Sequence, residues 1–575
     1  READAFGIKG PVSILNEADR RDLVRMAIQQ AGGNLSAFKG SSDTILNLVS
    51  LAKERMLSPE DDLTPAVRES WSSQFPTIYK TYQQLLAKHQ LLDFDDLIFK
   101  TVKLFEAHGD VRKRYQQAFP FISVDEYQDI NDAQYRLIRQ LAPPAWDICV
   151  IGDPNQAIYG FRGADVRYFH GFCRDYPQAK TIHLNQNYRS TETILRASGQ
   201  VMAADRGNKD EGIWSGICGV NTLTIAQLPT EKAEAEYIIK TIEAEVGGIS
   251  HFSMDSRRID GAHGTSERGF SDFAVLYRVK EQARALREAF KRSGIPFQGV
   301  WDQKLEARKG IRELISYLKA ALSLGSDLDL ERILNFPARG ITQETVEVLQ
   351  RWCEKTGIPL ESALHRARDI PGLTPRARKK VTSFLEDLSR LKERIQGRDV
   401  YKQIRLIVDQ FKIADEMSDN TAFEENLGIL LTFSRPFGDR STEFLARLSL
   451  ENEQDMYDPR AERVALMTMH ASKGLEFPVL FIAGCEDGLI PYRRKRDEDQ
   501  DLMEERRLFY VALTRAKEEV FLTHTKQRLW FGRKTVRHVS PYLEAIQEDL
   551  KQYKKPFSGR STAKKRSAQL SLFEL

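Results

Sequence analysis

The short apolar run at residues 121–124 ends abruptly in two adjacent carboxylates, Asp125 and Glu126, and this junction constrains the fold more than any other stretch of the chain. A run of this length, preceded by Phe119 and Pro120, predicts a buried strand of a parallel sheet. Open α/β sheets bind their ligands at the carboxyl edge, where both carboxylates would lie. One carboxylate can hold a hydrated Mg²⁺ ion, and its neighbour can orient or deprotonate an attacking water.

Four further strings follow, two of them after strand-like runs at 148–151 and 181–184. They read GDPNQAIYGFRG from residue 152, NQNYRS from 185, VALMTMHASKGLEF from 464 and EERRLFYVALTRA from 504. Together with the first segment, and in this order, the strings closely resemble motifs II to VI of the UvrD/Rep family of superfamily 1 DNA helicases. The resemblance extends from about residue 11 to about residue 542.

The resemblance implies an α/β fold with two RecA-like P-loop-type domains, each a parallel sheet flanked by helices and each carrying a mainly helical inserted subdomain. The first RecA-like domain is expected to be incomplete. The expected boundaries are a helical insertion at 1–105, the remainder of the first RecA-like domain at 106–195, the second RecA-like domain at 196–339 and 451–545, its helical insertion at 340–450, and a flexible basic tail at 546–575.

The composition is that of a globular protein with several domains, because 575 residues exceed what one core supports. Hydrophobic residues make up 41% and charged residues 29%, and no apolar stretch approaches the roughly 18–20 residues of a membrane span, so we expect a cytoplasmic protein. The formal net charge is only +3, so any DNA site must be a local basic stripe. The family resemblance implies single-stranded and partly duplex DNA as partners.

For the nucleotide, the resemblance implies ATP and Mg²⁺ as cofactors and gives roles to single residues. Asp125 would engage the metal ion, and Glu126 would activate the hydrolytic water. Dividing such groups between two domains would make closure of the cleft depend on the triphosphate, which is the cycle that a motor needs. The other nucleotide residues would be Gln156 and Arg189 at the γ-phosphate, Tyr188 at the adenine, Gly474 and Glu476 at the ribose side, and Arg515 as an arginine finger from the opposite RecA-like domain.

For DNA, the resemblance selects aromatic and cationic residues. Tyr159, Phe161 and Arg162 follow Gln156 directly, and bases stack on aromatic faces for about 1–3 kcal/mol each whatever their identity. The family usually carries Trp where this chain has Phe161, which keeps a stacking face of smaller area. The remaining candidates are Thr468 and His470, for the DNA backbone and the interdomain interface, and Phe94, which is either close to the single strand or a core anchor.

A nucleoside triphosphatase of this kind needs a GxxxxGK[ST] loop, whose N–H groups, lysine and hydroxyl hold the phosphates and the metal ion. No such string occurs between Arg1 and Val124, and the nearest, at residues 38–42, reverses the Gly-Lys order. In the family the loop lies upstream of a segment that resembles residues 11–19. We therefore expect the chain to begin after the loop and to hydrolyse ATP poorly by itself, with natural loss of the loop as the alternative.

The last 25 residues of the chain contain a basic segment and a short peptide motif. Residues 551–567 hold seven basic and no acidic side chains, which predicts a flexible arm able to touch phosphates. The following string, Gln569-Leu570-Ser571-Leu572-Phe573, resembles the peptide with which bacterial proteins dock to the DNA polymerase sliding clamp. Leu572 and Phe573 would enter an apolar pocket while Gln569 fixes the register. The alternative is a terminus without a partner.

The sequence thus favours an ATP-dependent 3′-to-5′ DNA helicase or translocase of UvrD/Rep type in DNA repair or replication restart, with the polarity implied by the family alone. A hypothesis of another class stays open: a non-catalytic DNA-binding protein, tethered to the sliding clamp, whose ATPase has degenerated. A helicase-nuclease ranks last, because no C-terminal segment is long enough for a nuclease domain.

Overall fold

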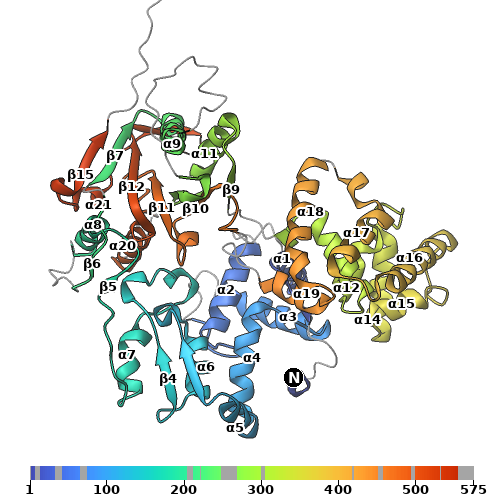
Figure 1. Cartoon of the computed structure of the whole chain (residues 1–575). Coiled ribbons are helices and arrows are strands. Elements are labelled where there is room, and N and C mark those ends of the chain that lie inside the picture. Colours follow the sequence, from blue (N-terminus) through green and yellow to red (C-terminus); the bar gives the residue numbers. More distant parts are fainter. Residues whose placement is uncertain are drawn as a thin grey trace, which may run out of the picture. The chain divides into compact units, whose positions relative to one another are not determined.

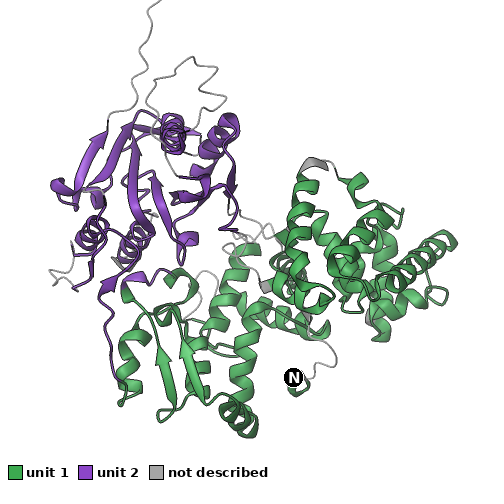
Figure 2. Ribbon diagram, in the orientation of Figure 1, with its two compact units in different colours: residues 1–154, 159–179, 301–456 green, residues 155–158, 180–300, 457–575 purple. Residues whose placement is uncertain are grey.

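A computed structural model of the chain divides into two compact units (Figures 1 and 2). Unit 1 comprises residues 1–154, 159–179 and 301–456, and unit 2 comprises residues 155–158, 180–300 and 457–575. The residues that the structure describes are 2–6, 13–32, 42–64, 74–203, 212–219, 222–247, 268–299, 305–417, 420–450, 457–493, 499–530 and 532–554.

The first part of unit 1 is helical, as predicted for the residues before 105. Its helices enclose an apolar core in which Leu23, Val49 and Tyr79 are fully buried. Side-chain caps fix where helices begin: Asn16 accepts a hydrogen bond from the Asp19 N–H at 2.8 Å, which satisfies a donor that has no partner within the helix. The elements are β1 (Ser13–Ile14), α1 (Glu17–Gln30), α2 (Ser42–Glu54), α3 (Phe75–Lys88), β2 (Leu91–Leu92), which pairs in parallel with β1, and α4 (Phe94–Ala107).

The second part of unit 1 is a small parallel sheet with its helices. β3 (Phe121–Val124) pairs in parallel with β4 (Asp147–Val150), which confirms the strands predicted at 121–124 and 148–151. A buried aromatic cluster follows β3, where the Tyr127 ring meets the Phe172 ring edge-on at 5.4 Å between centroids. The helices are α5 (Gly109–Ala118), α6 (Asp132–Leu141) and α7 (Arg167–Asp175).

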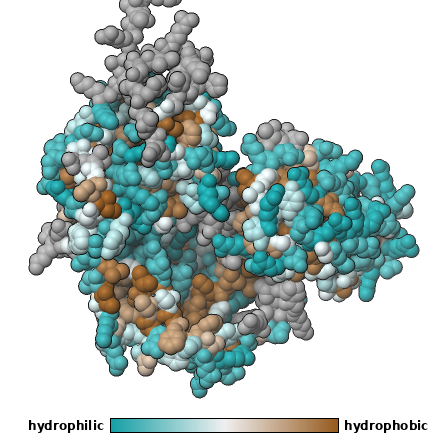
Figure 3. Space-filling model, viewed as in Figure 1, coloured by the Kyte–Doolittle hydropathy of each residue, from teal (hydrophilic) through white to brown (hydrophobic). Residues whose placement is uncertain are grey.

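Two predictions about strands are wrong, one in this part of unit 1 and one at the start of the 180–300 segment of unit 2. β3 is not fully buried: Phe121 is 77% exposed, whereas Val124 packs on the aromatic cluster around Tyr127. Exposed and half-buried residues alternate along the strand, so one face of the two-stranded sheet is covered and the other is exposed among the described residues. Figure 3 shows apolar side chains on the surface of the part of unit 1 that contains β4, α6 and α7. The run at 181–184 forms no strand, and Leu184 is 85% exposed, since no described strand pairs with it; pairing starts only at β5 (Gln186–Asn187) with β6 (Trp214–Ser215).

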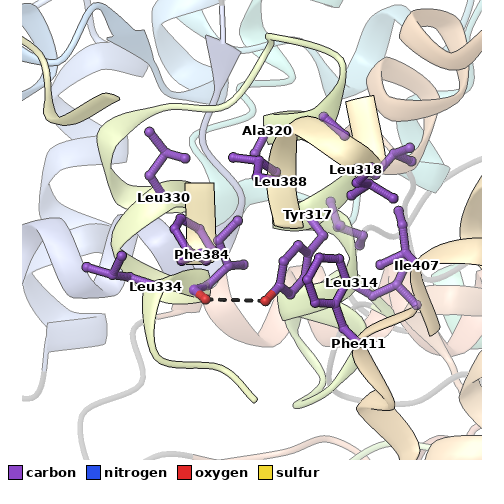
Figure 4. Packing of buried hydrophobic residues seen from close by; sticks show 14 of the residues in the cluster. Leu314, Tyr317, Leu318, Ala320, Leu330, Leu334, Phe384, Leu388, Ile407 and Phe411 are labelled. Atoms are coloured by element: carbon purple, nitrogen blue, oxygen red, sulfur yellow. Dashed lines mark hydrogen bonds between the residues drawn. The ribbon is translucent and has the colours of Figure 1, made fainter. Parts of the chain in front are cut away.

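The third part of unit 1 is a helical block with one continuous core that runs from Leu305 to Leu448. Tyr317 stacks on Phe411 with 4.2 Å between ring centroids, and its hydroxyl donates to the Ile333 carbonyl at 3.3 Å (Figure 4). The block therefore begins well before the boundary predicted at 340. Its helices are α12 (Ile311–Ala321), α13 (Asp327–Leu334), α14 (Gln343–Thr356), α15 (Leu360–His365), α16 (Pro375–Ile395), α17 (Val400–Phe411), α18 (Asn420–Ser434) and α19 (Ser441–Leu450).

Unit 2 is built on a seven-stranded, wholly parallel sheet with the order β15-β7-β12-β11-β8-β10-β9. Every residue of β8 is buried, as expected for a parallel strand covered on both faces. The strands are β7 (Leu223–Leu228), β8 (Phe273–Tyr277), β9 (Phe297–Gly299), β10 (Val464–Thr468), β11 (Phe477–Ala483), β12 (Ala516–Thr525) and β15 (Lys551–Lys554). The longer helices are α8 (Glu192–Ala203), α9 (Glu231–Val246), α11 (Lys280–Ser293) and α20 (Asp499–Leu513).

The edge of this sheet corrects the predicted start of the tail. Lys551–Lys554 lies within the segment expected to be flexible from 546, yet it forms β15 and pairs in parallel with β7. The Gln552 side chain donates to Thr224 Oγ1 at 2.8 Å, and Leu550 is buried, so local contacts hold the strand in place. The predicted clamp-binding residues Gln569, Leu570, Leu572 and Phe573 lie outside the described residues. Within the described part of the chain, no helix has the length and apolar character of a membrane span.

Candidate functional site

Asp125 and Glu126 lie directly after β3 in unit 1, at the carboxyl edge of the small sheet, and both are exposed. Glu126 has a φ of 52°, a left-handed conformation that costs a non-glycine residue on the order of 1–3 kcal/mol. The Glu126 N–H donates to Asp125 Oδ1 at 2.8 Å. The local backbone therefore holds the two carboxyl groups in one fixed arrangement.

Gln128 supports this arrangement, although sequence reasoning did not single it out. Its side chain is fully buried. Gln128 Nε2 donates to Glu126 Oε2 at 2.5 Å, and Gln128 Oε1 accepts from the Asp153 N–H at 3.0 Å. A Cβ at Gly152 would overlap Gln128 Oε1 and lie 2.8 Å from the Phe169 ring. Gln128 thus connects the ends of both strands of the sheet. The only indication of this role in the sequence is that Gln128 lies within the first motif string.

The predicted stacking residues form a preassembled aromatic turn in unit 1. The rings of Tyr159 and Phe161 lie 6.1 Å apart, and the Arg162 guanidinium carbon lies 5.6 Å and 5.5 Å from their centroids. The Gly163 N–H donates to the Gly160 carbonyl at 3.0 Å and closes the turn. Phe161 is 59% exposed. The turn therefore presents an aromatic face and a cation together, as single-strand binding requires.

Phe94 begins α4 and is half-buried, and it belongs to none of the described apolar clusters. Both interpretations of Phe94, a contact with the single strand and a core anchor, stay predictions. The start of α4 is fixed by charge: Lys53 Nζ lies 2.7 Å from Asp93 Oδ2 and 2.9 Å from Asp96 Oδ1, with all three side chains fully buried. Burial alone would raise the pKa of Asp93, but Lys53 and Arg20 hold that pKa below its usual range.

In unit 2, Gln156 lies in contact with two cations. Lys473 Nζ donates to the Gln156 carbonyl at 2.9 Å, and Arg515 Nη2 donates to Gln156 Oε1 at 3.4 Å. Arg515 is only 2% exposed, and its Nε donates to the Val511 carbonyl at 2.9 Å, so α20 orients the guanidinium. Lys473 was missed, although it lies within the string that starts at residue 464.

Glu476 contacts two basic residues in unit 2, one of them the predicted Arg189. Its Oε2 accepts from Arg189 Nε at 2.7 Å, and its Oε1 lies 2.7 Å from Lys517 Nζ. Hydrogen bonds from Lys517 and Arg189 lower the pKa of Glu476 to about 2. Tyr188 is 78% exposed and its hydroxyl donates to Gln186 Oε1 at 2.7 Å, which leaves its ring open to a flat partner.

Three more predicted residues lie in unit 2 near the end of β10. Thr468 is the last residue of β10, and its Oγ1 accepts from the Ala471 N–H at 3.2 Å. His470 starts a short 3-10 turn and is half-buried, and Gly474 has a φ of 83°. That φ is easily adopted by glycine and disfavoured for other residues, so Gly474 permits the turn that leads to Glu476.

Comparison with known proteins identifies the family. A model of the UvrD/REP helicase N-terminal domain matches residues 1–177, and a model of the UvrD-like helicase C-terminal domain matches residues 182–370 and 374–527. The chain belongs to the UvrD/REP helicase family. Among similar proteins, the ATP-dependent DNA helicase PcrA of Staphylococcus epidermidis is 34% identical over 600 residues, which cover 99% of this chain and 79% of that protein. PcrA of Staphylococcus aureus is 33% identical over 564 residues, which cover 96% and 74%.

The predicted site residues of this UvrD/REP helicase fall into two sets. Unit 1 carries the carboxylates after β3 and the aromatic turn. Unit 2 carries the glutamine–arginine contact and the Glu476 ion pairs. The oxygen ligands of Asp125 and Glu126 are those that Mg²⁺ prefers. No group of three or more His, Cys, Asp or Glu suited to a metal ion occurs among the described residues.

Proposed function

We propose that this protein is an ATP-dependent DNA helicase or translocase that moves 3′ to 5′ along single-stranded DNA and acts in DNA repair or replication restart. Family membership supports the class of activity. The observation that carries the proposal further is the position of Gln156, which contacts Arg515 and stands only three residues before the aromatic turn that starts at Tyr159. A change at the γ-phosphate would reach the DNA site through this short segment.

In the proposed mechanism the protein supplies position and charge. Asp125 would hold the metal ion, and Glu126, fixed by Gln128, would orient the attacking water. Mg²⁺ would neutralise phosphate charge when bound. Arg515 and Arg189 would stabilise the charge that develops on the transferring phosphoryl group, for which such arginines are worth roughly 10³–10⁵ in rate. Arg189 must leave its ion pair with Glu476 to do so, and Lys517 would then keep Glu476 neutralised.

The aromatic turn would bind the single strand. Phe161 and Tyr159 offer faces on which bases stack without regard to sequence, and Arg162 lies within reach of both rings. Phe94, Thr468 and His470 remain proposed DNA contacts. Stacking without base-edge hydrogen bonds suits an enzyme that must step along any sequence.

Catalysis by this polypeptide has one further requirement. The sequence contains no GxxxxGK[ST] string, and without such a loop the γ-phosphate has no backbone cradle or lysine. We therefore expect the 575-residue polypeptide alone to bind ATP weakly and turn it over slowly.

The deciding experiment compares DNA-stimulated ATP hydrolysis by this polypeptide and by a form extended upstream with the family's phosphate loop, each with its Glu126→Gln variant. The proposal expects turnover in the extended form that Glu126→Gln abolishes. If the extended form is silent while single-strand binding is intact, the protein is a non-catalytic DNA-binding protein and the helicase proposal is wrong.

A bacterial polymerase sliding clamp is the proposed protein partner, through Gln569, Leu570, Leu572 and Phe573. A labelled peptide of residues 568–575 should bind the clamp, and a matched peptide with Leu572 and Phe573 replaced by Ala should not. Absence of binding at high micromolar peptide would remove this partner from the proposal.

A further inference from the structure

A glutamate that none of the motif strings contains lies against the aromatic turn. Glu54 ends α2 in unit 1, far in sequence from the turn that Gly160–Arg162 forms. A Cβ placed on Gly163 would lie 2.5 Å from Glu54 Oε2, 3.4 Å from its Cδ and 3.7 Å from its Cβ. The Glu54 side chain therefore packs against the backbone of the turn at Gly163, whose φ of 75° also favours glycine.

The carboxyl group of Glu54 has charged neighbours from every element around it. Arg162 belongs to the aromatic turn, Asp95 to α4, Arg20 to α1, and Arg55 follows Glu54 in the chain; all four act on its charge. Asp95 is itself held in place, because its Oδ2 accepts from Arg20 Nη2 at 2.9 Å and from Ser50 Oγ at 2.6 Å. Asp95 follows Phe94 directly, so this polar cluster adjoins both the aromatic turn and the start of α4.

We propose that Glu54 is a positioning residue for DNA: its carboxyl group supports the turn that carries Phe161, and its protonation sets how much positive charge Arg162 offers to a DNA phosphate. This inference rests on the proposed function, since it assigns a role within the same DNA site. When Glu54 is neutral, the positive charge of the Arg162 guanidinium can pair fully with a DNA phosphate. When Glu54 is ionised, its carboxylate attracts the Arg162 guanidinium and repels the DNA phosphate.

The physical balance favours the neutral form near neutral pH. Burial raises the pKa of Glu54 to about 8; Asp95 adds to the rise, and Arg162, Arg20 and Arg55 oppose it. A bound phosphate adds another negative charge nearby, which raises this pKa further. By linkage, DNA binding takes up a proton, and affinity falls as the pH rises through the pKa of the free protein.

The test measures binding of a dye-labelled oligo(dT) strand to the full 575-residue chain by fluorescence anisotropy, from about pH 6.5 to about pH 9. The wild type should lose affinity roughly three- to fivefold across this range, the size expected for one partly exposed charge pair. Glu54→Gln, which stays neutral, should bind like the wild type at low pH and keep that affinity at high pH. The control is Glu106→Gln, an exposed glutamate on α4, which should follow the wild type.

A salt titration separates a charge effect from a structural one. The slope of log K against log[salt] should be weaker at high pH than at low pH by about 0.7 in the wild type, one phosphate contact for a single strand, and unchanged in Glu54→Gln. If Glu54→Gln fails to fold, Arg162→Gln serves instead and should likewise bind with no pH dependence. A wild-type pH profile in either variant would overturn the inference. If the wild type binds no strand at any pH, the DNA site itself is wrong and both proposals fall.

Discussion

Replacement of the buried Lys53 by Met is the sharpest test of how the start of α4 is held. Methionine keeps the length and most of the volume of lysine, so the change removes a charge and leaves little cavity. Lys53 Nζ lies within 3 Å of carboxyl oxygens of both Asp93 and Asp96, and the three side chains are fully buried. In the variant both carboxyl groups stay buried, with Arg20 Nη2 3.7 Å from Asp93 Oδ2 and with Lys100 still acting on the charge of Asp96.

The expected cost follows from that geometry. Removing one partner of a buried ion pair costs about 3–5 kcal/mol, because the remaining charge loses both water and its counterion. Asp93→Asn in the Lys53→Met background should return at least about 1 kcal/mol, since the amide removes a charge. The amide also keeps the oxygen that caps the Asp96 N–H at 2.9 Å, so the helix cap is not lost in the double variant.

Hydrogen exchange read by mass spectrometry suits a chain of two units, where a single unfolding midpoint is poorly defined. Peptides from α2 and α4 should lose protection in Lys53→Met, while peptides from β8 should not change. The control is Lys80→Met, an exposed lysine whose nearest acidic partner lies 3.8 Å away and whose loss should cost less than about 0.5 kcal/mol. Equal protection in the two variants would refute the reasoning.

The pH dependence has a definite sign. The pKa of Asp93 in the folded chain is below its ordinary value, so its pairing stabilises the fold above the unfolded pKa of about 4, and this stability is lost as the pH falls. In Lys53→Met the stability of the fold should instead rise as the pH falls, because protonation of Asp93 removes a buried charge that has lost its partner. The gap in protection between the wild type and the variant should therefore narrow on acidification.

Three other predictions concern the site. Phe161→Ala should weaken oligo(dT) binding by about 1–3 kcal/mol with an unchanged salt slope, while Phe161→Trp keeps or improves binding; a changed slope in the alanine variant would argue against stacking. Gly163→Ala, at a φ of 75°, should destabilise the turn by more than about 1 kcal/mol, seen as faster exchange in residues 159–167. Arg189→Ala should raise the pKa of Glu476 from about 2 toward its ordinary value in an NMR titration; an unmoved pKa would mean that Lys517 alone holds it.

The sequence was most informative where short-range pattern and topology agree. The paired strands at 121–124 and 147–150 follow from apolar runs that end in polar strings. Asp125 and Glu126 follow β3 directly, at the carboxyl edge of the sheet as predicted, while their roles and that of Phe161 stay proposals. The exposure of Phe121 was not predictable, because burial depends on neighbours that a run of four residues does not specify.

Other features escaped prediction for physical reasons that differ. Leu184 sits in an apolar run with no partner strand in the described chain, and a strand needs a neighbour for its backbone groups. β15 was read as tail because lysines dominate it, yet edge strands commonly carry lysine. Lys517 and Glu54 matter through contacts with residues far away in sequence, which no local pattern encodes.

The order of strands in unit 2 also has a consequence for synthesis. β8 ends at Tyr277, but both of its neighbours, β10 and β11, start only at Val464 and Phe477. At about 5–20 residues per second, a ribosome needs roughly 10–40 s to deliver them. The helical block, rich in local contacts, can fold during that interval. The wholly apolar β8 has neither of its neighbouring strands to pair with until then. Yield of native protein should therefore depend on translation speed and on chaperones that shield this strand.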